Sequence, residues 1–408
     1  MSNPPTAPSL PKRVPIPKHG VDYRGKVVLA PMVRSGELPS RLLALHYGAD
    51  LVWGPETIDR AMIGTTRRVN PRTSCIEWSR ISSNGGRPDQ PSKENVLYRI
   101  DPAREGGKLI YQIGTAKPEL AVEAAKLVAG DVAGIDVNAG CPKPFSTTGG
   151  MGAALLKEPE RLASILEALV EEVGKVWEIG ISVKIRLLDT PAETEKLVRR
   201  LVATGITGLT IHCRTTPMRP RERAIREQLR MIADVCREAG VACLVNGDVY
   251  NRDTAFELMK EYGVDGGMIA TAAESNSSAF RTKTDGGLAP WREVVEKYVE
   301  LALSVENRYG NTRFLLTQLI PGKDPTFQQV NRQKCYKSLV DVLGLEKLAD
   351  KAADVDKILG IGEDQKRKAE STPLDTSERK KSKPALPVAN ETPLGPALET
   401  QGRVALSV

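Results

Sequence analysis

The chain has 408 residues, enough for one large domain and a smaller one, and 40% of them are hydrophobic without any run of the ~18 apolar residues that a membrane helix needs. Six cysteines without a C-x-x-C pair, and three histidines with no ligand spacing to them, disfavour a zinc site or a disulfide framework. The net charge of +7 favours a polyanionic partner, although a basic tail on a neutral enzyme would give the same charge.

Strand and helix patterns alternate from residue 26 to residue 271. Apolar, β-branched runs typical of buried parallel strands lie at 26–30, 49–53, 108–113, 133–138, 181–187, 207–212, 241–246 and 264–270. Segments with apolar residues three and four positions apart, typical of helices, lie at 40–48, 119–129, 160–173, 194–205, 225–240 and 253–263. Eight such units predict an α/β fold, a (β/α)8 TIM barrel over residues 24–288, rather than an open sheet.

Three regions depart from this alternation. Residues 58–107 are rich in turn-forming residues and predict an arm inserted into the barrel. After Pro290 only helical patterns follow, at 291–310, 313–320, 327–344 and 345–359, which predict a small all-α domain at residues 289–360. Residues 1–23, with six prolines in the first twenty, and the polar, basic residues 361–408 are predicted to be disordered.

Cys141 follows the strand at 133–138 by three residues, in the part of a barrel where active sites form. Gly140 and Pro142 predict a tight turn that presents the thiol at the barrel mouth. A thiol with an ordinary pKa of about 8.5 is mostly protonated near neutrality, so it can donate a proton as readily as it can act as a nucleophile. A turn cysteine without a role is the alternative.

Lys184 and Arg186 alternate with apolar residues in the strand at 181–187, so both side chains are expected to point into the barrel. Buried cations need anionic or hydrogen-bonding partners. A flavin's pyrimidine edge or a uracil carbonyl would satisfy them, and the alternative is an ion pair with Asp136.

Polar residues also end the last three strands. His212 ends the strand at 207–212, and its place beside a basic loop favours ligand contact over a structural role. The loops after the seventh and eighth strands are where such barrels hold phosphate through backbone N–H groups, and here they carry Asn246, Gly247, Asp248, Ala270 and Thr271. The glycine-rich residues 149–154 lack a full G-x-G-x-x-G and follow a loop, so we do not interpret them as a dinucleotide site.

Seven short motifs occur at these strand ends and loops: LAPMV at 29–33, YQIGT at 111–115, NAGCP at 138–142, TTGGMGAALL at 147–156, KIRL at 184–187, IHCRT at 211–215 and NGD at 246–248. Taken together they resemble the tRNA-dihydrouridine synthase family, over residues 24–355. The segments ADLVWGPETID and GIDVNAGCPK are most similar to the eukaryotic branch that acts on the D-loop uridine at tRNA position twenty.

The resemblance implies an FMN-dependent oxidoreductase, re-reduced by NADPH, that reduces uridine to 5,6-dihydrouridine in tRNA. Cys141 matches the family's proton donor, which would act on the face of the uracil opposite the flavin. Asn138 and Arg186 would contact the uracil edge, and we assign Arg214 to the substrate as well.

The resemblance also implies a cofactor site. Pro31, Met32 and Val33 would lie against the flavin ring. Hydrogen bonds to the cofactor or its phosphate are implied for Gln112, Lys184, His212, Asn246, Gly247, Asp248, Ala270 and Thr271. The family usually has an arginine after the eighth strand, where this chain has Thr271, so backbone amides would have to carry more of the phosphate binding.

Two basic clusters are candidate tRNA contacts, because phosphate contacts dominate nucleic-acid affinity. Residues 214–230 hold six arginines against two glutamates, and residues 307–337 hold six basic residues against Asp324 alone. Either cluster could instead be a solvated face. We expect a monomer.

Two other functions are compatible with the barrel. An FMN barrel that reduces a free pyrimidine would not need the basic helical domain, and a non-catalytic RNA-binding barrel would bind no flavin. The absence of a secretory pattern, together with basic clusters at 366–368 and 379–383, predicts a location in the cytoplasm and/or the nucleus.

Overall fold

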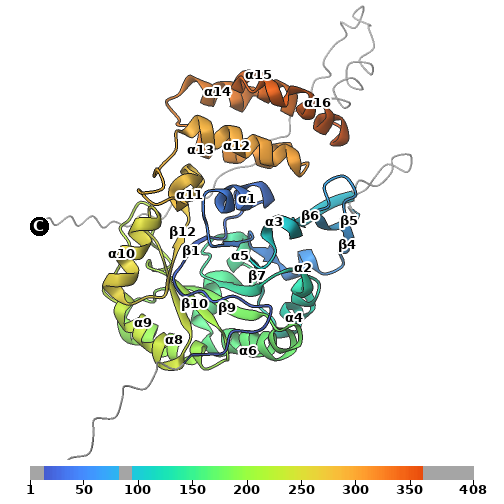
Figure 1. The fold of residues 1–408 in the computed structure, drawn as a ribbon. Helices are drawn as coiled ribbons and strands as arrows, with labels where there is room; N and C mark the ends of the chain where they lie inside the picture. Colours follow the sequence, from blue (N-terminus) through green and yellow to red (C-terminus); the bar gives the residue numbers. More distant parts are fainter. Residues whose placement is uncertain (1–12, 82–93, 362–408) are drawn as a thin grey trace, which may run out of the picture. The chain divides into compact units, whose positions relative to one another are not determined.

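The barrel forms because eight short apolar strands bury both of their faces. The computed structural model describes residues 13–81 and 94–361. In that part of the chain the parallel strands form a ring that closes where β2 pairs with both β1 and β7 (Figure 1). The strands are β1 (Lys26–Leu29), β2 (Leu51–Trp53), β7 (Leu109–Gly114), β8 (Gly134–Ala139), β9 (Gly180–Arg186), β10 (Gly208–His212), β11 (Ala242–Asn246) and β12 (Gly266–Ile269). The predicted barrel is confirmed.

Helices follow the strands, as predicted, and cover the outside of the barrel (Figure 1). Thr190 and Glu193 form a capping box at the start of α8, and α9 ends at Gly240 in the left-handed region that favours glycine (φ +77°). The main helices are α1 (Leu38–His46), α4 (Pro118–Lys126), α6 (Pro159–Leu169), α8 (Pro191–Val202), α9 (Leu229–Ala239) and α10 (Arg252–Tyr262), with shorter α5 (Pro144–Thr147), α7 (Lys175–Trp177) and α11 (Thr271–Ser275).

Strand register brings the predicted site residues to one level at the barrel mouth. His212 at the end of β10 is in register with Arg186 at the end of β9 and with Asn246 at the end of β11. Two residues before Arg186 in β9, Lys184 is in register with Asn138 of β8. Because side chains alternate along each strand, residues in register on neighbouring strands face the same side.

The inserted arm is a three-stranded antiparallel sheet of β4 (Thr66–Val69), β5 (Ile76–Ile81) and β6 (Glu94–Ile100). The short β3 (Thr57–Ile58) pairs with β7, and α2 (Asp59–Met62) and α3 (Pro102–Glu105) lie on either side of the sheet in the sequence. Trp78 and Tyr98, paired across β5 and β6, are buried and pack edge to face.

The helical region after the barrel contains α12 (Trp291–Ser304), α13 (Tyr309–Leu319), α14 (Pro325–Arg332), α15 (Tyr336–Leu343) and α16 (Ala349–Ile358). The continuous helical pattern at 327–344 therefore divides into two helices. The break is stabilised by Asp356, whose carboxylate accepts hydrogen bonds from the backbone N–H groups of Tyr336 and Lys337, both at 2.8 Å.

The structure also describes part of the N-terminal segment that we expected to be disordered. Val14 N–H donates to the carbonyl of Gly240, and Tyr23 is 1% exposed against the barrel. The predicted disorder of residues 13–23 is therefore not what the structure shows. Residues 1–12 and the predicted disordered basic tail from residue 362 lie outside the described part. Within the described residues, no helix is long and apolar enough to span a membrane.

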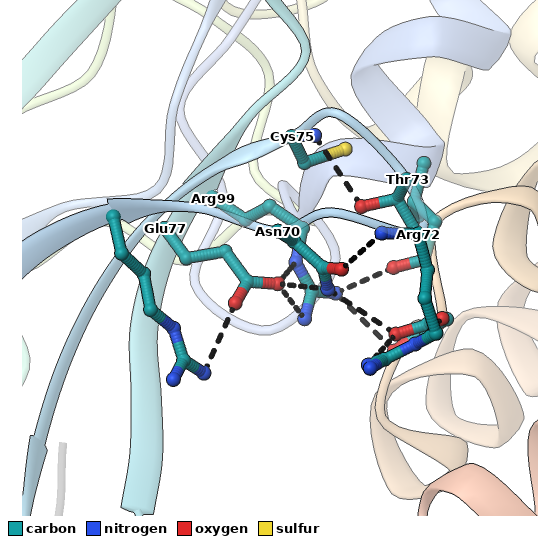
Figure 2. A network of polar contacts seen from close by, with 9 residues as sticks. Asn70, Arg72, Thr73, Cys75, Glu77 and Arg99 are labelled. Atoms are coloured by element: carbon teal, nitrogen blue, oxygen red, sulfur yellow. Dashed lines mark hydrogen bonds and ion pairs between the residues drawn. The ribbon is translucent and has the colours of Figure 1, made fainter.

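A network of charged groups joins the arm to the loop between α12 and α13 (Figure 2). Arg72 donates to both carboxylate oxygens of Glu306, at 2.5 and 2.6 Å, and Asn70 donates to the same carboxylate. Arg99 donates to Glu77 and to the carbonyl of Val305. Since Glu306 is only 7% exposed at its side chain, the network fixes the helical region against the arm.

We predict that Glu306→Gln lowers the free energy of unfolding at pH 7 by about 1–2 kcal/mol. This is less than a fully buried charged hydrogen bond contributes, because Arg72 is 54% exposed. Burial alone would raise the pKa of Glu306, but hydrogen bonds from Arg72 and Asn70 outweigh it and hold the pKa below its ordinary value. Such a carboxylate stabilises the fold above its unfolded pKa of about 4.3 and loses that contribution as the pH falls.

Urea unfolding at pH 7 and pH 4 tests this prediction. The variant should lose less stability on acidification than the wild type. Asp131→Asn is the control, because it breaks the ion pair with Arg67, which is 45% exposed, and should cost less than about 1 kcal/mol. Equal effects of the two substitutions would contradict the assignment.

Candidate active site

A cavity of about 860 Å³ opens at the carboxyl ends of β9 to β12. Its walls come from the loops after these strands, where the sequence predicted a site. Among the predicted residues it is lined by Arg186, His212, Arg214, Asn246, Gly247, Asp248, Ala270 and Thr271. The parallel order of β9 to β12 thus brings together predicted residues as far apart in sequence as Arg186 and Thr271.

The loop after β11 approaches His212 closely and is held by side-chain contacts. Gly247 has φ +98°, and a methyl group there would lie 3.0 Å from Cδ2 of His212. Asn246 donates its amide to the carbonyl of Met268 at 2.9 Å. Asp248 accepts from Arg214 at 2.5 Å and from the backbone of Ala224 at 2.6 Å, so its carboxylate is already engaged.

Arg214 is a support of this loop in the structure. Its Nε donates to the carbonyl of Glu222, its Nη2 donates to the carbonyl of Pro220 and to Asp248, and its Nη1 lies 3.2 Å from Nε2 of His212. All three nitrogens therefore have protein partners. Direct contact of Arg214 with a substrate stays a prediction.

His212 is held in its neutral form. Burial lowers its pKa far below the ordinary value, and the charges of Lys184, Arg186, Arg214 and Arg226 lower it further. A neutral imidazole can donate or accept a hydrogen bond, but it is a poor source of a proton.

Arg226 also lines the cavity, although it belongs to the basic cluster at 214–230 that we expected to contact tRNA. Its Nη2 donates to the carbonyl of Gly247 at 2.5 Å. Its Nη1 is buried and has no hydrogen-bond partner among the described residues. An unpartnered buried guanidinium nitrogen is costly, so this group points to an anionic or carbonyl ligand. Because a loop has no regular repeat, its sequence does not show which arginines point into the cavity and which point to solvent.

Lys184 has no ion pair within residues 13–81 and 94–361. Burial lowers its pKa to about 8, and repulsion from Arg186 acts in the same direction. Asp136 does not pair with it, because neutral groups satisfy that carboxylate: Gln112 donates at 2.8 Å and Ser182 at 2.7 Å. The structure therefore disfavours the alternative ion pair, and the amide N–H of Gln112 is directed to Asp136.

The Cys141 turn is shaped by Asn138 and Arg186. The side-chain oxygen of Asn138 accepts from the backbone N–H groups of Gly140 and Cys141, at 2.9 and 3.0 Å. Arg186 donates from Nε to the carbonyl of Gly140 at 2.7 Å. Burial raises the pKa of Cys141, so its thiol is protonated at neutral pH.

Glu56 lies next to this turn and was not among the residues predicted from sequence. It follows the end of β2, and its Oε1 accepts from the hydroxyl of buried Ser146 at 2.9 Å. It borders a second cavity of about 940 Å³, which Val33 also lines. The position of Glu56 three residues after a barrel strand was the signal that could have found it.

The residues at 31–33 follow β1 at the same mouth. Pro31 and Met32 are half-buried, and Val33 is 43% exposed on the second cavity rather than the first. Their contact with a flavin ring stays a prediction.

The two basic clusters differ in how they are exposed. In the first cluster Arg219, Arg221 and Arg223 are exposed, whereas Arg214 and Arg226 turn inward. In the second cluster exposed cations on the helical region form no ion pair among the described residues: Arg308, Lys323, Arg332 and Lys334.

Comparison with known proteins finds one family. The model of the family described as dihydrouridine synthase (Dus) matches residues 28–342. The chain is 50% identical to the tRNA-dihydrouridine(20) synthase (NAD(P)+) of Schizosaccharomyces pombe, over 80% of this chain and 66% of that protein, just under two thirds of its length. It is 44% identical to the synthase of the same name from Saccharomyces cerevisiae, over 79% and 84%. The tRNA-dihydrouridine(20a/20b) synthase of S. cerevisiae is 27% identical, over 72% and 70%.

We predict that Gly247→Ala destabilises the site through two effects. The left-handed backbone costs about 1–3 kcal/mol for a residue with a Cβ, and the methyl group would press on His212. Gly64→Ala is the matched control, because Gly64 also has positive φ (+83°) but open space around it. Urea unfolding should show a larger loss for Gly247→Ala. A loss equal to that of the control would mean that the contact with His212 does not matter.

Proposed function

We propose that this chain, which belongs to the dihydrouridine synthase family, reduces uridine to 5,6-dihydrouridine at position 20 in the D-loop of tRNA. FMN would be its cofactor and NADPH its reductant. Its identity to two yeast synthases named for position 20, 50% and 44%, exceeds its identity of 27% to a synthase named for 20a/20b. This difference supports the choice of position.

The cationic cavity at the strand ends is the observation that carries the cofactor assignment. It combines the unpartnered Nη1 of Arg226 with the absence of a side chain at Gly247. Lys184, which has no ion pair among the described residues, lies two residues before the cavity residue Arg186 in β9. These features fit a phosphate near Gly247 and an electron-rich ring edge near Lys184. When bound, FMN supplies the hydride for reduction.

The chain's own residues orient the substrate and supply the proton. The Cys141 thiol, held by Asn138 and Arg186, is protonated at neutral pH and would give its proton to carbon five of the uracil. His212 is too weak a base to carry that proton and is better suited to a hydrogen bond with the cofactor. Both basic clusters would contact tRNA phosphates. We propose that the enzyme acts as a monomer, because both clusters belong to the same chain. Location in the cytoplasm and/or nucleus stays a prediction.

We predict that Arg226 supplies the phosphate charge that Thr271 cannot. Arg226→Gln should weaken FMN binding about ten- to hundredfold, because a charged hydrogen bond contributes about 1.5–3 kcal/mol. Arg219→Gln, at an exposed position of the same loop that does not line the cavity, should leave the affinity unchanged. Quenching of FMN fluorescence on titration with protein freed of bound flavin measures both.

The same titration tests Thr271→Arg. If Arg226 already binds the phosphate, the added arginine gives less than a threefold gain in affinity. Strong tightening by Thr271→Arg, together with no effect of Arg226→Gln, would assign the missing charge to position 271 instead.

We predict that Cys141→Ala separates the two halves of the reaction. Bleaching of flavin absorbance by NADPH should stay at the wild-type rate, because the thiol takes no part in NADPH oxidation. Recovery of absorbance on addition of tRNA should slow about 10²–10⁴-fold, which is the usual contribution of a positioned general acid. Cys335→Ala, also a half-buried cysteine, is the control. Recovery at the wild-type rate in Cys141→Ala would remove the thiol from the mechanism.

A further inference from the structure

Glu56 is a half-buried residue that contacts the Cys141 loop through Ser146, and the proposed reaction leaves it without a role. One oxygen accepts from Ser146, and the other, Oε2, is buried without a hydrogen-bond partner among the described residues. Two glycines, which have no side chain, provide the space for Glu56 and for its partner Ser146. A methyl at Gly114 would lie 2.5 Å from Oε1 of Glu56, and one at Gly152 would lie 2.4 Å from Oγ of Ser146.

The carboxyl group and the thiol affect each other directly. Burial raises the pKa of Glu56, and the hydrogen bond from Ser146 together with the nearby side chains of Asn138 and Cys141 offsets part of this rise. Burial raises the pKa of Cys141, the backbone of Lys143 lowers it, and the charge of Glu56 raises it again. The geometry also places Glu56 at the Cys141 turn, because a methyl group at Gly152 would lie 2.4 Å from Oγ of Ser146, which donates to Glu56, and 2.6 Å from the carbonyl oxygen of Cys141.

Glu56 also borders the second cavity, which extends from the barrel mouth to the helical region. A cavity of about 940 Å³ with several polar and charged residues in its walls has room for ordered water. Glu56 lines this cavity and Cys141 does not.

We propose that Glu56 is the proton-relay residue of Cys141, which returns to the thiolate a proton taken from water in the second cavity. This inference rests on the proposed function. The S–H bond of Cys141 breaks as the C–H bond at carbon five of the uracil forms. The Glu56 carboxylate then takes a proton from water, which leaves hydroxide in the solvent, and the O–H bond so formed breaks as the thiol re-forms. No electrons are exchanged in these steps.

The first test measures the titration of the Cys141 thiol and needs no tRNA. The rate of iodoacetamide alkylation at Cys141 is followed against pH by peptide mass spectrometry, which separates it from Cys335. Replacing the carboxylate by a neutral amide in Glu56→Gln should lower the thiol pKa by about one unit. Glu56→Asp should restore most of the difference, and Ser146→Ala, which keeps the charge, should change it less. An unchanged thiol pKa in Glu56→Gln would overturn the proposal.

Other charged groups must be considered in this titration. Arg186 contacts the Cys141 turn, and the second cavity around Glu56 is lined by Arg34, Glu37, Arg99, Glu306 and Arg308. Lys143 is in the turn itself. Because all of them are retained in Glu56→Gln, the difference between the two titrations reports position 56.

The second test separates the first turnover from later ones. In Glu56→Gln the first turnover uses the proton already on the thiol, so its rate should stay within about twofold of wild type. Later turnovers should slow about tenfold, because the thiolate must be reprotonated without its relay. Rapid-quench analysis of dihydrouridine formed by pre-reduced enzyme with NADPH in excess should show this burst.

A loss of rate in the first turnover would assign Glu56 to positioning the turn, and equal rates in all turnovers would remove it from the reaction. Either result overturns the relay. If the wild-type enzyme forms no dihydrouridine in tRNA, the proposed function fails instead, while the alkylation profile still reports the Glu56–Cys141 pair.

Discussion

Uncompensated positive charge in the barrel mouth is the constraint on which the rest of the site depends. Arg186 and Arg226 line one cavity, Lys184 lies two residues before Arg186 in β9, and none of the three has a carboxylate partner among the described residues. Burial lowers the pKa values of Lys184 and His212, and repulsion from the neighbouring cations lowers them further. The chain stabilises the arrangement only in part, through backbone carbonyls. An anionic ligand would complete it.

One of these cations, Arg186, also holds the Cys141 turn in place. Arg186 lies between the cavity and the Cys141 turn, since it donates to Gly140 on one side and to the carbonyl of Thr215 on the other. A ligand that neutralises the cavity would therefore also act on the turn that presents the thiol. The network around Glu306 provides a second fixed point, because it joins the arm to the helical region that carries exposed cations. The geometry of the barrel mouth thus depends on a few buried charged side chains.

Much of this arrangement could be predicted from the sequence. Eight apolar runs between amphipathic segments determine a closed parallel barrel, and closure places strand ends such as His212 and Asn246 at one mouth. The paired strands of the arm were not predictable, because turn-rich sequence shows no clear period. The break between α14 and α15 was missed because it depends on Asp356, twenty residues beyond the start of α15. Hydrogen-bond partners were the least predictable feature. Arg214 and Arg226 look alike in sequence, yet one is fully engaged and the other has a free buried nitrogen.

The central claim is that the cavity is built to neutralise an anionic cofactor, and comparing FMN with riboflavin tests it most directly. The two molecules differ only in the phosphate group, so the ratio of their dissociation constants isolates its contribution. The account predicts that FMN binds at least about a hundredfold more tightly at low salt, because more than one charged hydrogen bond reaches the phosphate. The difference should shrink as ionic strength rises. Equal affinities for FMN and riboflavin would contradict the account.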